Sequence, residues 1–425
     1  MVYYHLDLFM PRVLEVGAAR NMAGGYAFGN DFFPIWLTAR EWRRQRLDPY
    51  GPEMTRKIQS GLFGRPLDPQ NPSDPVSDYR TFAYPAFTDL LFWPAAEAPF
   101  ANVRIWLAFL LVGTTLASAL LWMRALSWDI GRMWVAVILL LILCSYPVLE
   151  GLYAGQLGLL VGFLLAASLL ALHRGRYLLA GILMALTMIK PQMTLLATLY
   201  LTAWSLHDWR RRSHFSLGLL VALAVLIGAA LVVWPHWIPS WLDVVLGYHR
   251  YAKPPLVAEV LTAPLGPAAS GAVASFLSVL FAIVALTAAW RHRAASADSS
   301  DFWLTLSLVL CVTAITLLPG QAIHDHVILL PAIFLVARGW RALFKDWAGR
   351  MLVIIGSGVL LWPWFAAFSL IALRPVLTHH QFYSKAVFAL PLRTAAVFPF
   401  VVLGLLALLW RTQAASEAGD PSLPC

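Results

Sequence analysis

Apolar residues along the chain gather into long runs that polar residues interrupt only briefly. Many runs after residue 102 approach the ~20 apolar residues with which a helix crosses a bilayer. The pattern therefore predicts an all-α, polytopic membrane protein. The predicted spans are Val103–Met123, Trp134–Leu149, Gln156–Leu172, Phe215–Trp234, Ala272–Trp290, Phe302–Leu318, Leu352–Leu373 and Ala386–Trp410.

Three shorter apolar runs accompany these spans. Tyr177–Ile189 and Gln192–Trp204 are separated only by Lys190 and Pro191, and VILLPAIFLVA follows His326. Short runs of this kind often bend back within the membrane or line a cavity. Together the runs predict about 10–12 transmembrane or re-entrant helices.

Composition supports this prediction. The chain is 60% apolar and 12% charged, whereas soluble domains carry roughly 25% charged residues, so a soluble enzyme is excluded. The net charge is +9, but the cations form short clusters between apolar runs, which is typical of membrane orientation rather than of a nucleic-acid surface. The three cysteines have no metal-ligand spacing, and we expect neither a disulfide framework nor a nucleic-acid partner.

The cation pattern predicts the orientation. We divide the chain into an N-terminal segment at 1–30, an extracytoplasmic catalytic loop at 31–102, a transmembrane domain at 103–410 and a cytoplasmic tail at 411–425. We interpret the segment at 1–30 as a truncated first-helix region. The connections that are then cytoplasmic hold Arg124, Arg132, Arg174, Arg176, Arg210, Arg211, Arg212, Arg291, Arg293, Arg338, Arg341, Lys345, Arg350 and Arg411. The outer ones after the first span hold Lys190, Arg250, Lys253, Arg374, Lys385 and Arg393. The excess inside fits the positive-inside rule.

This orientation places every polar-rich connection on the non-cytoplasmic face, and we expect the chemistry there. The cytoplasmic connections are short and basic and contain no phosphate-cradling glycine pattern, which disfavours ATP-driven transport.

Asp31 heads the long outer loop, directly before an aromatic stretch that sets its carboxylate at the water boundary. Partial desolvation would raise its pKa and make it a stronger general base. The alternative is a helix N-cap, a position that favours both Asn30 and Asp31.

Lys190 places a charge between two apolar helices, where it needs an anionic partner such as a lipid headgroup. Pro191 breaks the helix at that depth. The alternative is a lysine that snorkels at a hairpin tip.

A polar turn, His324-Asp325-His326, begins the last of the short apolar runs. The i, i+2 spacing of the histidines does not favour zinc, and hydrogen bonding to a phosphate is easier for them at a helix start. The alternative is a solvated turn. Outer Arg250 could add to an electropositive vestibule or be ordinary surface.

The outer loop alternates acids with aromatic residues, which suits sugar recognition and equally suits an amphipathic lid. Its acids fit no cation-ligand template, so we expect neither a metal nor a cofactor. They are Asp48, Glu53, Asp68, Asp74, Asp78 and Asp89.

These motifs in this order resemble glycosyltransferase family 87. They are the acid followed by Phe, DPY in the outer loop, an aromatic-Tyr-Pro before the first span, GQLGLLVG, RGRYLLAGILMALTMIKPQ and the HDH turn. The resemblance runs from about Gly29 to about Pro331 and is most specific across Gly155 to Pro191.

The resemblance implies a GT-C membrane enzyme similar to polyprenol-phosphate-mannose-dependent mannosyltransferases. It implies inverting transfer of a hexose, with mannose as the first candidate, from a polyprenyl phosphate to a glycan or glycolipid. The transfer would take place outside the cytoplasm of a bacterial cell. Asp31 matches the family's base, Lys190 its Lys-Pro element and His326 its later histidine, with His324 second. The motifs add Tyr50, Tyr84 and Gln156, with Arg250, as candidate substrate-binding residues.

Two other classes compete with a transferase. A transporter or lipid-linked substrate flippase should show broken helices at corresponding positions of two halves, and we find one broken pair, around Lys190. A scaffold protein would leave Lys190 and the outer acids without a purpose.

The cation distribution predicts which loops are cytoplasmic. Single cysteines placed at 210–212 and 341–345 should react with a membrane-impermeant thiol reagent only when the cytoplasmic side is open to it. Labelling of both loops from outside would reverse the orientation and every site assignment that depends on it.

Overall fold

The chain is almost entirely helical. The structure is a computed structural model that describes residues 1–68, 70–71, 74, 79–251, 257–320, 322–344 and 347–418, and within these ranges no β-strand occurs. Among the described residues, four helices are long and apolar enough to cross a membrane, or five if a bent pair counts as one span. The predicted all-α polytopic class is confirmed.

The first quarter of the chain is a set of short helices rather than an open loop. It consists of the π-helix η1 (Tyr4–Phe9), α1 (Met10–Ala18), η2 (Ala23–Tyr26), α2 (Phe33–Gln45), α3 (Pro52–Phe63), α4 (Phe87–Phe92) and η4 (Trp93–Glu97). Tyr4 anchors the first of them, because its hydroxyl donates to the backbone carbonyl of Phe388.

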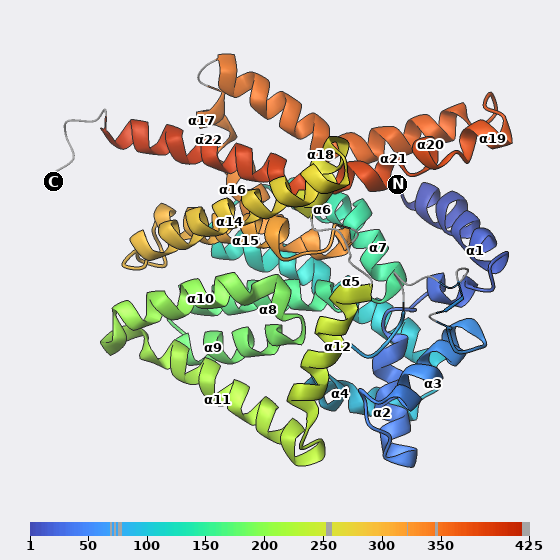
Figure 1. Cartoon of the computed structure of the whole chain (residues 1–425). Helices are drawn as coiled ribbons and strands as arrows, with labels where there is room; N and C mark the ends of the chain where they lie inside the picture. Colours follow the sequence, from blue (N-terminus) through green and yellow to red (C-terminus); the bar gives the residue numbers. More distant parts are fainter. Residues whose placement is uncertain are drawn as a thin grey trace.

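Apolar helices of varied length form the body of the molecule and run roughly side by side across the view (Figure 1). They are α5 (Phe100–Ala125), α6 (Arg132–Leu143), α7 (Tyr146–Ala154), α8 (Gly158–His173), α9 (Tyr177–Leu186), α10 (Pro191–His207), α11 (Trp209–Val233), α14 (Pro267–Arg291), α15 (Ser300–Thr316), α16 (Leu330–Arg338), α18 (Trp347–Leu373) and α22 (Phe398–Ala418). In Figure 1, α1, α2 and α3 lie at one end of this body, and the C-terminal end of α22 lies at the other.

Proline placement corrects two predicted spans. Trp134–Leu149 is not one helix, because α6 and α7 meet at a 56° bend. Ser145, the N-cap of α7, is extended, and Pro147 lies in the first turn of α7. Proline has no N–H to donate to the carbonyl four residues earlier, and its ring would clash with that carbonyl, so α6 cannot continue through this position. Ala386–Trp410 is likewise divided into α20 (Lys385–Phe388), α21 (Leu390–Ala395) and α22.

The connection at 235–270 also contains unpredicted helices, α12 (Trp237–Tyr251) and α13 (Val257–Thr262). Helix α12 packs on the outer segment, since Trp241 Nε1 donates to the Ala83 carbonyl at 2.9 Å. The ring of Trp237 meets that of Phe87 edge to face. A segment expected to be a plain connection therefore covers the predicted outer loop.

The predicted cytoplasmic connections meet one another at one end of the helices. Arg338 donates to the carbonyl of Leu126, Arg212 donates to that of Arg293 at 3.2 Å, and His173 lies 3.0 Å from a carboxylate oxygen of Asp298. Guanidinium groups here satisfy carbonyls that helix ends leave without intrahelical partners. If the spans alternate in direction, the connections on one side of the membrane lie near one another, and these contacts have that arrangement.

Candidate functional site

Four of the predicted outer connections converge on one cluster of polar side chains. It contains Asp31, Arg80, Gln156, Lys190 and Asp325, joined in an unbroken chain of hydrogen bonds. We call these five residues the polar cluster. Residues separated by up to 294 positions in the sequence thus form one site. The cluster contains three residues selected from the sequence, Asp31, Gln156 and Lys190.

Lys190 and Asp325 form the buried ion pair of the cluster. The lysine nitrogen lies 2.7 and 2.8 Å from the two oxygens of Asp325, and the residues are 6% and 1% exposed. Lys190 stands between the 3-10 helix η5 (Thr187–Ile189) and α10, where Pro191 opens the new helix. The structure therefore supplies an internal anion in place of the expected lipid headgroup and contradicts the snorkelling alternative.

Gln156 connects the ion pair to Asp31. Its Oε1 accepts from Lys190 at 3.1 Å, and its Nε2 donates to Asp31 Oδ2. Because a lysine ammonium can only donate, the Gln156 atom that faces it must be the oxygen. Lys190 therefore fixes the orientation of the Gln156 amide, so that its NH₂ group faces Asp31.

Asp31 is held by three donors. Asn30 Nδ2 donates to Oδ1 at 3.0 Å, and Arg80 and Gln156 complete the set. Helix α2 has Phe32 at its N-cap and no capping side chain, so the expected alternative, that Asp31 caps this helix, is wrong.

The pKa of Asp31 departs from expectation. Burial alone would raise it, but the adjacent Arg80 guanidinium, aided by His324 and the Gln156 amide, outweighs burial and lowers the pKa below its ordinary value. The expected rise is thus reversed, and Asp31 is a carboxylate at neutral pH. A carboxylate has about four lone-pair sites, so three donors leave room for a fourth.

The glycines of GLYAGQLG make this packing feasible. Gly155 has a positive φ of 73°, and a Cβ there would lie 3.2 Å from the Cα of Gly29. A Cβ on Gly158 would lie 2.1 Å from Asp325 Oδ1, closer than atoms can approach. These glycines let the segment before α8 contact both halves of the site.

The HDH turn is buried in the 3-10 helix η7 (Ile323–Leu329) rather than solvated. His324 lies close enough to Asp31 and Lys190 to interact with both electrostatically, and burial lowers the pKa of its ring. His326 interacts with Asp325 and His324 and faces the backbone at Ala395. The geometry therefore ranks His324 before His326, the reverse of our expectation.

The other predicted residues lie at different distances from the cluster. Tyr84 lies close enough to Asp31 and Asp325 for both to act electrostatically on its hydroxyl, whereas Tyr50 donates its hydroxyl to the Tyr84 carbonyl at 2.8 Å. The side chain of Arg250 lies outside the described residues.

The outer acids do not gather. Asp74 pairs with Arg65, and Asp48 and Asp68 each accept from the backbone two residues onward. Asp89 is 1% exposed, and burial raises its pKa well above its ordinary value. In the described part of the chain no group of three or more His, Cys, Asp or Glu side chains could hold a metal, and Asp78 lies outside that part.

Sequence reasoning missed three contributors to the site. Asp325 was visible only as the middle of HDH, Arg80 only as one cation of the outer loop, and Glu150 not at all. Glu150 is half-buried in α7 and close enough to Asp31 to interact with it electrostatically. Arg80 carried no local signal, because its backbone φ of 47° is known only from the structure.

Comparison with known families identifies the chain. A family model described as Glycosyltransferase family 87 matches residues 82–319, more than half of the sequence, and the chain belongs to this family. The matched range includes Gln156 and Lys190, whereas Asp31, Arg80 and Asp325 lie outside it. No curated protein and no solved structure gives a significant match. The protein is thus a membrane glycosyltransferase, and the transporter and scaffold alternatives are set aside.

Gly158 gives a test of the packing around the ion pair. Gly158→Ala should lower the free energy of unfolding by about 1–3 kcal/mol, the usual cost of overpacking, because the new methyl group displaces Asp325 from Lys190. Thermal unfolding in detergent, followed by tryptophan fluorescence, measures the change.

Gly113→Ala in α5 is the matched control, because a Cβ there meets nothing within 4 Å. It should leave stability unchanged or raise it slightly, since alanine favours helix over glycine. Equal stability of the two variants would contradict the packing described for Gly158.

Proposed function

We propose that this member of glycosyltransferase family 87 transfers a hexose from a polyprenyl-phosphate donor to a glycan or glycolipid acceptor, with inversion. Mannose is the first candidate for the hexose. The reaction takes place at the polar cluster, on the non-cytoplasmic face of a bacterial cytoplasmic membrane. The observation that carries this proposal is the junction of Asp31 to Lys190 through Gln156, because it sets an ionised carboxylate beside a buried cation.

Asp31 acts as the general base. Its side chain is 19% exposed, so an acceptor hydroxyl can approach the remaining lone pair. The lowered pKa makes Asp31 a weaker base but keeps it unprotonated. Weak basicity suffices, because the anomeric carbon gains oxocarbenium character and the hydroxyl loses its proton only as the new bond forms.

Lys190 and His324 stabilise the departing lipid phosphate, with His326 as the second histidine. All three ammonium hydrogens of Lys190 have acceptors, two oxygens of Asp325 and one of Gln156. A donor phosphate oxygen must therefore replace one of them. Gln156 Oε1 is the weakest acceptor of the three, because it is neutral and lies farthest away.

A lipid-borne donor suits this molecule. Its isoprenoid tail can stay in the bilayer beside the apolar helices, and only the phosphate and the sugar need to reach the cluster. The donor is a phosphodiester, so the group that leaves the sugar is a stable lipid phosphate. Its departure needs no strong general acid. Tyr84 borders the cluster, and in this proposal its hydroxyl contacts the sugar.

Replacement of Asp31 tests the assignment of the base. Asp31→Asn keeps the shape of the side chain but cannot accept a proton, so turnover should fall by about 10² or more, while donor binding persists. The assay uses membranes containing the full chain, polyprenyl-phosphate mannose and an acceptor glycan, with the product followed by mass.

Asp7→Asn, which changes an exposed carboxylate in η1, is the control and should retain full turnover. Asp31→Asn with wild-type transfer would remove Asp31 as the base and direct attention to Asp48 and Asp78.

Arg80 gives a prediction about pH. Arg80→Met removes the main group that lowers the pKa of Asp31 and leaves burial, which raises it, unopposed. Protonated Asp31 is inactive, so the acid limb of the kcat/KM profile should move to higher pH in the variant. Rates measured across pH 4 to 8 show the shift.

Arg65→Met is the matched control, because Arg65 pairs with Asp74 in the same outer segment. It should leave the acid limb where the wild type has it. An Arg80→Met profile that falls at the wild-type pH would show that Asp31 is not the titrating base.

A further inference from the structure

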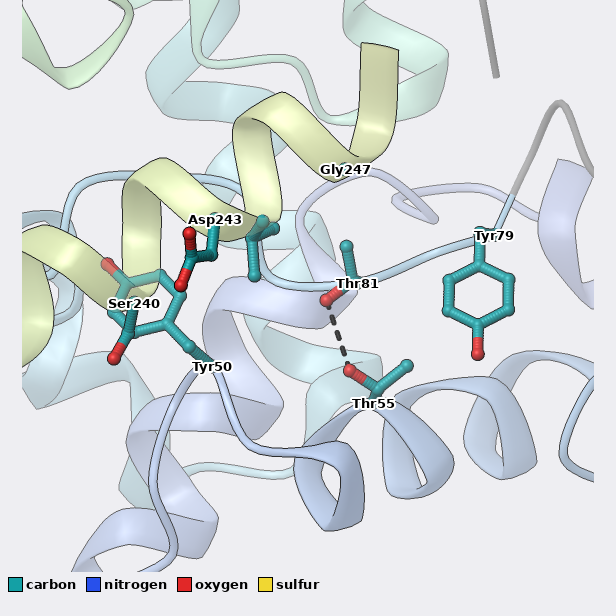
Figure 2. A pocket seen from close by; sticks show the side chains of 8 residues that line it. Tyr50, Thr55, Tyr79, Thr81, Ser240, Asp243 and Gly247 are labelled. Carbon is teal, nitrogen blue, oxygen red and sulfur yellow. Dashed lines mark hydrogen bonds between the residues drawn. The ribbon is translucent and has the colours of Figure 1, made fainter. Parts of the chain in front are cut away.

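A groove lies beside the polar cluster, between the outer segment and α12. This groove has a volume of about 360 Å³ and is lined by Tyr50, Thr55, Tyr79, Thr81, Ser240 and Asp243, among others. Figure 2 shows the rings of Tyr50 and Tyr79 on either side of the Thr55–Thr81 pair, whose hydroxyls are 3.1 Å apart. Ser240 and Asp243 come from α12 on the opposite wall.

The lining selects for one kind of ligand. Hydroxyls can both donate and accept, and the exposed carboxylate of Asp243 accepts from ligand hydroxyls. The tyrosine rings offer flat apolar faces with a polar edge. Asp243 would repel a phosphate, and the hydroxyl groups would lose hydrogen bonds against an isoprenoid chain. A neutral molecule rich in hydroxyl groups fits all of these features.

One short stretch of backbone joins the groove to Asp31. Tyr79 and Thr81 line the groove, and Arg80 between them turns away to pair with Asp31. The φ of Arg80 is 47°, uncommon for a residue with a side chain. Such strain persists where the surrounding structure demands it, and here it directs adjacent side chains to two sites at once.

The opposite wall is fixed against the same stretch. The Trp241 side chain donates to the carbonyl of Ala83, so α12 is tied two residues beyond Thr81. The hydroxyl of Tyr50 donates to the carbonyl of Tyr84, next to Asp31. The two walls of the groove are therefore held together by the segment that carries Arg80, the residue that pairs with Asp31.

We infer that this groove binds the neutral glycan portion of the acceptor, so that the hydroxyl to be glycosylated reaches Asp31 while the next sugar units lie against Tyr50 and Tyr79. This inference rests on the proposed transferase function. It assigns the acceptor to the side of Arg80 away from the ion pair and leaves the donor to Lys190.

Binding of labelled oligosaccharides tests the groove without any turnover. Fluorescence anisotropy of labelled mannotriose, with labelled maltotriose as a second probe, is measured on the full chain in nanodiscs. Asp243→Asn and Tyr79→Ala should each weaken binding by about 10-fold or more, the loss expected for a hydrogen bond to a charged group or a stacked ring. Asp129→Asn, in the exposed connection after α5, is the matched control and should bind like wild type.

The outcomes separate the two proposals. Asp31→Asn that binds the probe normally but transfers nothing supports both of them. A second outcome is that the groove variants bind the probe more weakly than wild type, but the wild type itself shows no transferase activity. This result would support the groove and contradict the proposed reaction. Wild-type protein that binds neither probe, or groove variants that bind as tightly as Asp129→Asn, would overturn the inference.

Discussion

The site depends on one buried ion pair, between Lys190 and Asp325. Each charge would cost several kcal/mol to bury alone, and removal of one partner from such a pair typically costs about 3–5 kcal/mol. The pair joins the start of α10 to η7 and, through Gln156, the segment before α8 and the loop before α2. Its geometry therefore determines how four distant parts of the chain meet. The close approach needed there explains why a side chain at Gly158 would displace Asp325.

The fold class could be predicted from the sequence because bilayer thickness imposes a minimum length on apolar runs. The positions of Asp31 and Lys190 could also be predicted, since each is a charge beside apolar stretches. Hydropathy alone did not predict the helix breaks at Ser145 and Ala389, although Pro147 and Pro391 lie in the first turns of the helices that follow them. Hydropathy measures the preference of a segment for lipid, and it does not report where the backbone breaks.

The partners of the charges could not be predicted for a different reason. Lys190 required an anion, and the sequence analysis named a lipid headgroup, because pattern alone gives no distance between residues 135 positions apart and so could not identify Asp325. The pKa of Asp31 shows the same limit. Burial was predictable from the neighbouring aromatic residues, whereas the opposing charge of Arg80 depends on a left-handed backbone conformation 49 residues away. The sign of the shift follows from that contact.

The balance of charge in the cluster bears on the proposed mechanism. Asp31 and Asp325 offset Arg80 and Lys190, so the resting cluster is close to neutral. During transfer, Asp31 would gain the acceptor proton and lose its charge, while the lipid phosphate would gain one. Negative charge thus moves from the Arg80 end of the cluster toward the Lys190 end, along the line that Gln156 bridges. Because both cations are already fixed by hydrogen bonds, they need little reorganisation as the charge moves, and preorganised groups of this kind stabilise a transition state most effectively. The same pairing that makes Asp31 a weak base therefore prepares the site for the charge that the leaving group acquires.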